Sequence, residues 1–398
     1  MKPITVLSLF DGISCGQIAL ERANIPVNTY YASEIDKFAI QVTQKSYPNT
    51  IQLGDVTKID FKQFEGKVDL LIGGSPCQDL SIAGNRKGLA GERSGLFYKY
   101  VEALQTIKPK YFLLENNVGM PKEAYEEISQ LLGCYPVMIN SALVSAQSRK
   151  RFYWTNIGEK EYDLFGFPTC AIPQPEDKHI FLQDVLINGL SYLDKSYCIT
   201  VKEGKGSTLE YSLKKKRRTQ IAQPIIYNKY NNIYNTEKTF TLTSSPANIT
   251  SKGGQVVLYQ IPRGKNQGGI KKDKSPTLTS NSWEYNNFYC KPIQIGCLNE
   301  SNSQANRIYS VNGKSVTLKS NGGGGGANTG LYKVNLPDGD YLIRKLDPIE
   351  CERLQTLSDN YTEGISNTQR YKCIGNGWTV DVIAHIFNFL KEEFEKGI

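Results

Sequence analysis

The chain has 398 residues, which exceeds the length at which a single hydrophobic core usually stops growing, so we expect one large domain and a second region. Its composition is 39% apolar and 22% charged, which excludes a disordered chain, and its formal net charge of +8 suits a polyanionic partner without establishing one. Nine cysteines without a CxxC pair and only two histidines argue against a disulfide framework, a zinc site and a histidine-based triad, and free thiols indicate a reducing, cytoplasmic location.

The first predicted element is the strand "ITVLSL", residues 4–9. The apolar run around it stops at Asp11, so we expect neither a membrane span nor a signal peptide. Short β-branched runs then alternate with helical stretches as far as residue 157, which predicts an α/β fold built from βαβ units. The other candidate strands are "NTYYAS", "TIQLG", "VDLLIGG", "YFLLEN" and "YPVMINSALV". Ligands of such sheets bind where the strands end, so the residues after each strand are the candidate site.

Three of these strand ends favour a nucleoside cofactor. Gly12 and Gly16 follow the first strand and allow a ligand to approach the backbone at a helix N-terminus. Glu34 follows the second strand, where an acid can accept both hydroxyls of a ribose, and Asp55 follows the third, where it can accept an adenine amino group. Taken singly, each feature is equally an ordinary turn or a helix cap. Because no GxGxxG motif is present, S-adenosylmethionine is a better candidate than NAD.

The fourth and fifth strands end in residues that suggest covalent catalysis. Cys77 follows "VDLLIGG" in the turn "SPCQ", where small residues and the fixed Pro76 leave the thiol uncovered. Glu115 closes the apolar run "YFLL", so it is poorly solvated and able to remain protonated and donate. The simpler interpretations are a small buried residue and a capping residue. A thiol and an acid beside a methyl donor suit attack on an electron-poor ring.

The middle of the chain, residues 158–342, is predicted to be a β-rich insertion. It contains three similar stretches, "EKTFTLTSS" (237–245), "DKSPTLTSN" (273–281) and "GKSVTLKSN" (313–321), whose alternation predicts short strands. The insertion is either structural or a target-recognition region, and the basic run Lys214 to Arg218 is interpreted as a phosphate-contacting strip. Helical patterns return in residues 343–398, which are expected to complete the domain begun by residues 1–157.

The motifs "FDGISCG", "PCQDLS", "ENN", "QSRKRFYW", "RKLDPIECERLQ" and "GNGWTV" resemble, in this order, those of the DNA (cytosine-5) methyltransferases. The resemblance covers most of residues 4–157 and 343–393 and leaves the middle uncovered. Its wording is most similar to the branch that contains de novo methyltransferases and phage or bacterial relatives. It implies a Rossmann-like S-adenosylmethionine-dependent methyltransferase fold with an inserted β-rich target-recognition domain, in a bacterial or phage-infected cell.

The resemblance also implies roles for individual residues. Cys77 would attack carbon 6 of a cytosine flipped out of double-stranded DNA, Glu115 would donate to ring nitrogen 3, and carbon 5 would take the methyl group of S-adenosylmethionine. Arg149 and Arg151, two residues apart on a strand, would hold the flipped nucleotide from one face; their simpler interpretation is a solvated basic face. The residues expected around the cofactor are Phe10, Asp11, Gly12, Glu34, Ile35, Asp55, Val56, Leu96, Asn376 and Trp378.

Ser14, Asn117 and the pair Gly377–Trp378 depart from the common wording of the motifs, which bears on cofactor affinity and leaves the reaction class unchanged. One rival is a tRNA-modifying cytosine methyltransferase, although the "CFT" signature of that branch is absent from the middle region. Another is an inactive DNA-binding regulator, against which the complete set of Cys77, Glu115, Arg149 and Arg151 argues. No metal and no membrane partner are expected, and a monomer is favoured.

Overall fold

The computed structural model describes residues 2–75, 96–188, 191, 193–201, 219–224, 226–228, 233–235, 258–260, 269–271, 294–298, 307–310, 331–336 and 339–396. The chain divides into two compact units. The first contains Met1–Ile187, Leu193–Gly204 and Asp347–Ile398, and the second contains Asn188–Tyr192 and Lys205–Leu346. Each unit is considered by itself.

The first unit is built on a seven-stranded sheet with the order β3-β2-β1-β4-β5-β7-β6. Its strands are β1 (Ile4–Leu9), β2 (Val27–Ser33), β3 (Ile51–Gln52), β4 (Leu70–Gly74), β5 (Tyr111–Asn117), β6 (Val137–Asn140) and β7 (Lys150–Thr155). The six strands predicted from the apolar runs correspond to β1 to β6. Strands β1 to β5 pair in parallel, and β6 runs in the same direction because β7, which lies between β5 and β6, is antiparallel to both. The α/β prediction is therefore confirmed, and six carboxyl ends share one edge of the sheet.

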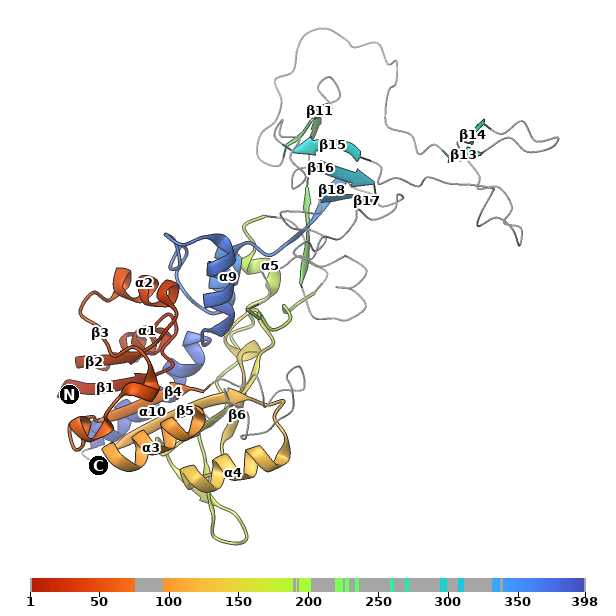
Figure 1. The fold of residues 1–398 in the computed structure, drawn as a ribbon. Coiled ribbons are helices and arrows are strands. Elements are labelled where there is room, and N and C mark those ends of the chain that lie inside the picture. The colour runs from red at the N-terminus through yellow and green to blue at the C-terminus, as the bar shows by residue number, and fades with distance from the viewer. Residues whose placement is uncertain are drawn as a thin grey trace. The chain divides into compact units, whose positions relative to one another are not determined.

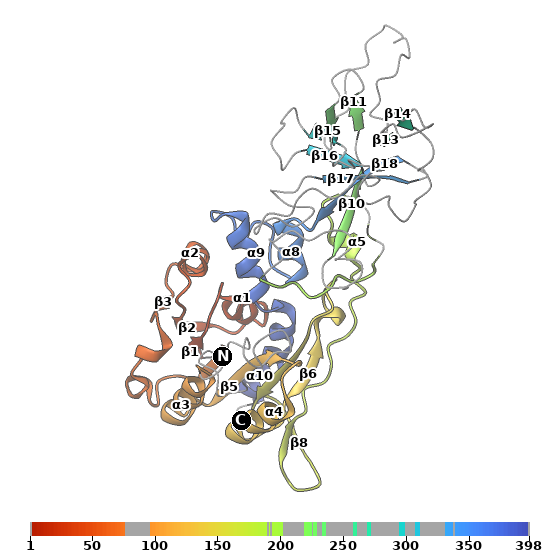
Figure 2. The same ribbon diagram turned by 45° about the vertical axis from the view of Figure 1, so that its right-hand side comes forward.

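Helices cover both faces of this sheet (Figures 1 and 2). The helices of one layer are α1 (Cys15–Arg22), α2 (Lys37–Ser46) and α10 (Val380–Lys396), and those of the other are α3 (Phe97–Ile107) and α4 (Lys122–Leu132). The last helix, α10, packs beside α1, so the C-terminal segment belongs to the same unit as the first strands.

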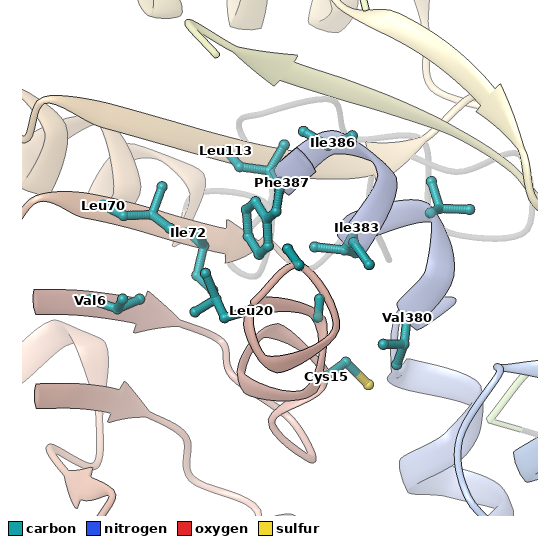
Figure 3. Close-up of a cluster of buried hydrophobic side chains, with 14 of the residues drawn as sticks. Val6, Cys15, Leu20, Leu70, Ile72, Leu113, Val380, Ile383, Ile386 and Phe387 are labelled. Carbon is teal, nitrogen blue, oxygen red and sulfur yellow. The ribbon is translucent and has the colours of Figure 1, made fainter. Parts of the chain in front are cut away.

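Alternation along the central strands supplies both layers of the core. Val6, Leu70, Ile72 and Leu113 point to the α1 and α10 side, whereas their neighbours Leu7, Leu71 and Leu114 point to α3 and α4. Figure 3 shows Phe387 of α10 between Leu113 and Ile72 of the sheet, with Ile383 of the same helix on its other side and Leu20 of α1 below Ile72. Burial of each such side chain contributes about 1.5–3 kcal/mol, so the edge that carries the strand ends rests on a rigid base.

Residues 158–187 lie with the first unit, so the second unit begins later in the chain than the expected boundary at 158. They form a hairpin of β8 (Lys160–Tyr162) and β9 (Pro168–Cys170), which is joined to the sheet-bearing unit by a bridge between Tyr135 and Thr169. They also form the short helix α5 (Leu182–Val185), which contacts α8 (Pro348–Leu354). The helix α9 (Asn367–Asn376) follows α8.

The second unit is rich in β-structure, as predicted. Its larger sheet has the order β10-β18-β17-β16-β15-β12-β11, and a separate hairpin pairs β13 with β14. The bounds are β10 (Gln220–Pro224), β11 (Ile226–Asn228), β12 (Ile233–Asn235), β13 (Leu258–Gln260), β14 (Gly269–Lys271), β15 (Gln294–Leu298), β16 (Arg307–Ser310), β17 (Leu331–Leu336) and β18 (Gly339–Lys345). The three repeated stretches and the basic run Lys214 to Arg218 lie outside the described residues.

Within the described ranges, no helix is long and apolar enough to cross a membrane.

Candidate active site

A cavity of about 320 Å³ opens in the first unit at the edge where the parallel strands end. The residues predicted for the cofactor and for catalysis line this cavity except Cys77, which lies outside the described residues. Gly16, which was expected to let a ligand approach, does not line it, because a Cβ there would meet Ile72 and Tyr30 of the protein itself. The chain before Cys77 is described as far as Ser75, and both Gly74, the last residue of β4, and Ser75 line the cavity. The lining residues that had been predicted are Phe10, Asp11, Gly12, Glu34, Ile35, Asp55, Val56, Leu96, Glu115, Arg149, Arg151, Asn376 and Trp378.

The turn between β1 and α1 is held in an unusual backbone conformation. Phe10, Gly12 and Ser14 have φ of 61°, 61° and 60°, in the left-handed region that favours glycine. Ser14 is the N-cap residue of α1, and its hydroxyl donates to Asp11 Oδ2 at 2.7 Å. A glycine at position 14 would remove the left-handed strain, of roughly 1–2 kcal/mol, but would also remove this hydrogen bond. The serine therefore costs some backbone strain, and in return its hydroxyl holds the Asp11 side chain in one orientation.

Asp11 is a half-buried carboxyl that lines the cavity. Tyr30 donates to its Oδ1 at 2.8 Å, opposite the bond from Ser14. Burial raises the pKa of Asp11 from 3.8 to about 6, against the opposing effect of hydrogen bonds from Ser8, Ser14 and Tyr30. At neutral pH the group carries a negative charge whose desolvation destabilises the fold, and a cation bound in the cavity would compensate that charge.

Glu34 and Asp55 occupy the ends of β2 and β3. Glu34 Oε2 accepts from the Gly12 amide at 2.8 Å, and its Oε1 accepts from the amides of Ile35 and Asp36, each at 2.8 Å. Asp55 caps the short helix that begins at Val56, and hydrogen bonds from the Thr57 amide and hydroxyl lower the pKa of its carboxyl. The capping interpretation therefore holds for Asp55, and both carboxylates still border the cavity.

Glu115 lies at the end of β5 and has both oxygens held by donors from other elements. The Arg151 Nε lies 2.8 Å from Oε1, and the Trp378 indole Nε1 donates to Oε2 at 3.2 Å. The residue is only 9% exposed. Arg151 reaches it because β7 is antiparallel to β5, with Arg151 opposite Asn117, so β7 begins at the edge where β5 ends.

Arg149 lies just before β7 and is 6% exposed. Its guanidinium donates to the carbonyl oxygens of Ile199 and Gly377, each at 3.0 Å. Both Arg149 and Arg151 also donate to the Cys198 thiol, so the two arginines share a face as their spacing predicted. Burial raises the pKa of the Cys198 thiol, but the charges and hydrogen bonds of the two arginines outweigh this effect and lower the pKa overall.

A buried pair of glutamines, absent from the predicted site, supports the same loop. Gln355 Nε2 donates to the carbonyls of Ile374 and Gly377 at 3.0 and 3.1 Å, and its Oε1 accepts from Gln147 at 3.2 Å. Both glutamines are fully buried. A polar residue at the end of the amphipathic stretch "ECERLQ" was the available signal for Gln355, whereas nothing in the sequence around Cys198 indicated a contact with the arginines.

The lining of the cavity fits S-adenosylmethionine. The cofactor carries sulfonium and ammonium cations, and the carboxyl groups of Asp11, Glu34 and Asp55 border the cavity. Its adenine ring needs apolar surface, and Ile35 supplies some, since this isoleucine is 76% exposed at the cavity edge. Among the described residues, no cluster of three His, Cys, Asp or Glu side chains could hold a metal ion.

Comparisons with known proteins identify the family of the chain. The family model described as C-5 cytosine-specific DNA methylase matches residues 4–392. The orphan methyltransferase M.SPRI of Bacillus phage SPR is 29% identical, with 98% of each chain covered. The orphan methyltransferase M.Rho11sI of Bacillus phage rho11s is 30% identical over 85% of this chain and 62% of that protein.

Two solved structures share the fold. The Entamoeba histolytica methyltransferase EhMeth matches with a TM-score of 0.52 and 15% identity, over 99% of both chains. The S. pombe Dnmt2 methyltransferase matches with a TM-score of 0.51 and 16% identity, over 98% of this chain and 99% of that one. At this level of identity the likeness concerns architecture, and it confirms the methyltransferase fold predicted from the motifs.

Proposed function

The chain belongs to the C-5 cytosine-specific DNA methylase family, and we propose that Cys77, Glu115 and Arg151 carry out its reaction in the cavity at the edge of the sheet. Members of the family transfer a methyl group from S-adenosylmethionine to carbon 5 of cytosine in DNA, through an adduct with a cysteine. The specific activity proposed is that of DNA (cytosine-5-)-methyltransferase, EC 2.1.1.37. The observation that supports it best is the Glu115 carboxyl, held by Arg151 and Trp378 beside the strand end that precedes Cys77.

In the proposed mechanism, the Cys77 thiolate forms a bond to carbon 6 of the flipped cytosine while Glu115 gives a proton to nitrogen 3. Carbon 5 thereby becomes nucleophilic, and S-adenosylmethionine supplies the methyl group that it takes. Loss of the carbon 5 proton to a base and return of the nitrogen 3 proton to Glu115 restore the aromatic ring as Cys77 leaves. Arg151 fixes one oxygen of Glu115 and, in this mechanism, would also donate to the carbonyl oxygen of the bound cytosine.

The roles of the remaining parts follow from their contacts. Arg149 keeps the segment Gly375–Trp378 against the cavity, since its guanidinium is bound to backbone carbonyls of the chain. Asp11, Glu34 and Asp55 bind the cofactor from the side of β1 to β3. The second unit reads double-stranded DNA, with Arg263 and Arg307 as candidate base contacts and Lys214 to Arg218 as phosphate contacts. We expect a monomer that acts in restriction-modification, in protection of phage DNA or in regulation.

Methylation sequencing of plasmid DNA from a host that expresses the chain tests this function. We expect 5-methylcytosine at one short recognition sequence, and none in a host that expresses Cys77→Ala. Sequencing of tRNA from the same cells separates DNA from RNA modification. Unmodified DNA with an intact, folded chain would contradict the proposed function and favour a binding role without catalysis.

A further inference from the structure

We propose that Trp378 positions Glu115, so that the proton of this acid points into the cavity toward nitrogen 3 of the bound cytosine. The inference rests on the proposed role of Glu115 and adds a residue that acts through it. Trp378 was expected only to surround the cofactor, but its indole N–H donates to Glu115 Oε2 at 3.2 Å.

Two hydrogen-bond donors flank the Glu115 carboxyl. Arg151 approaches Oε1 and Trp378 approaches Oε2, and the guanidinium and the indole N–H are donors that accept no hydrogen bond. A proton on the carboxyl therefore cannot face either neighbour. It must occupy a lone pair directed elsewhere, and the cavity that Glu115 lines offers that direction. Without the indole N–H, a proton on Oε2 could turn toward the vacated position and away from the cytosine.

The backbone next to Trp378 is held by hydrogen bonds. The carbonyl oxygen of Gly377, the residue before it, accepts from Arg149 Nη2 at 3.0 Å and from Gln355 Nε2 at 3.1 Å. The indole ring also packs against the buried cluster that contains α1 and α10. Two hydrogen bonds from buried side chains and a packed ring hold the indole in one orientation, which is what a positioning role requires.

The facing strand leaves space for this contact. A Cβ atom added to Gly74 would lie 2.9 Å from Trp378 Nε1 and 3.2 Å from Glu115 Oε2. Any side chain at position 74 would therefore push the indole away from the carboxyl. The glycine, the acid and the indole form one arrangement at the end of β4 and β5, in which Gly74 is paired with Glu115 across the sheet.

Trp378→Phe removes the N–H and keeps most of the ring. The matched control is Trp154→Phe, because Trp154 also donates from Nε1, to Ser129 Oγ at 3.0 Å, but lies in the core on the α4 side. The readout is the release of tritium from carbon 5 of labelled cytosine in DNA without cofactor. This exchange requires addition of Cys77, protonation of nitrogen 3 by Glu115, and replacement of the tritium on carbon 5 by a proton from solvent, so it reports these steps without methyl transfer. The cofactor dissociation constant is measured separately by equilibrium dialysis.

We expect Trp378→Phe to slow tritium release on the order of 10-fold, as for removal of one hydrogen bond of about 1.4 kcal/mol, with cofactor affinity nearly unchanged. Trp154→Phe should lower the melting temperature and leave the exchange rate intact. In a Glu115→Gln background, Trp378→Phe should cause no further loss, since residues that act through one another are not additive.

Normal tritium release by Trp378→Phe would overturn the inference, and so would a loss of the same size in the Glu115→Gln background. Weaker cofactor binding with a normal exchange rate would return Trp378 to the cofactor site alone. If Glu115→Gln itself exchanges tritium at the normal rate, the proposed role of Glu115 fails instead, so the two failures are distinguishable.

Discussion

Arg149 Nη2 donates a hydrogen bond of 3.0 Å to the carbonyl oxygen of Gly377, a residue 228 positions further along the chain. The same guanidinium binds the Ile199 carbonyl, so one side chain joins the start of β7, the segment around residue 199 and the loop after α9. These segments come from the beginning, the middle and the end of the first unit. The cavity thus depends on a junction that Arg149 closes.

Arg149→Lys tests this junction. A lysine keeps the charge, but a single ammonium group does not reproduce the planar fork that binds two carbonyls in different directions. We expect a decrease of about 1–3 kcal/mol in the free energy of unfolding, from a buried carbonyl left unpaired, and a fall in methyl transfer of roughly 10-fold or more. The partly buried Arg353, which pairs with Asp359 away from the cavity, provides the control, since Arg353→Lys should leave methyl transfer nearly unchanged. Equal effects of the two variants would contradict the role of Arg149.

The adjacent glycines of β4 provide a second test. A Cβ at Gly74 would meet Trp378 and Glu115, whereas a Cβ at Gly73 would meet the Tyr100 ring and the Leu9 carbonyl on the opposite face. Gly74→Ala should therefore slow methyl transfer by about 10-fold or more, while Gly73→Ala should mainly lower stability, by roughly 1–3 kcal/mol. Melting temperatures and single-turnover rates measured on both variants separate the two effects. A normal methyl-transfer rate in Gly74→Ala would show that the surrounding residues accommodate the added methyl group without disturbing Glu115.

Much of this architecture follows from the sequence and some of it does not. Apolar alternation predicts β1 to β6, and the residues after the strands predict Glu34 and Asp55, because these features depend on local pattern. The inward orientation of Arg149 depends on carbonyls as far as 228 residues away, which no local pattern encodes. The same holds for residues 158–187, whose association with the first unit is decided by packing.

Asp11 gives a prediction about pH. The folded chain binds the Asp11 proton more tightly than the unfolded chain, because burial raises its pKa from 3.8 to about 6. Stability from this group therefore falls as pH rises through that interval, and the full cost, about 3 kcal/mol, remains above pH 6. Asp11→Asn should raise the free energy of unfolding at pH 7 by up to about that amount, with the gain disappearing below pH 4.

Asp36→Asn should change the free energy of unfolding at pH 7 in the opposite direction. Hydrogen bonding and the charge of Lys372 outweigh the effect of burial and lower the pKa of Asp36, so its contribution is present above pH 3.8 and disappears as pH falls. This variant should be slightly less stable than the parent at pH 7. Urea unfolding at pH 4 and pH 7 checks both variants, and a destabilised Asp11→Asn at pH 7 would show that its carboxylate is compensated within the fold.

The basic run Lys214 to Arg218 is expected to contact phosphates. Replacing all five residues with neutral ones should weaken binding to every DNA sequence equally, and it should flatten the log–log dependence of affinity on salt by about 0.9 for each phosphate that is no longer neutralised. Titrations of labelled duplexes at several salt concentrations measure this slope. Weaker binding confined to one sequence would mean that the run reads bases.

The most direct measurement of the central claim is the mass of the complex formed with DNA that carries 5-fluorocytosine at the methylated position. Fluorine on carbon 5 prevents the final loss of a proton, so an enzyme that adds a thiolate to carbon 6 remains attached after methyl transfer. We predict a covalent complex that requires S-adenosylmethionine, with the DNA on the peptide that contains Cys77, and no complex with Cys77→Ala. Methylation of normal DNA without such a complex, or attachment at a different cysteine, would contradict the account.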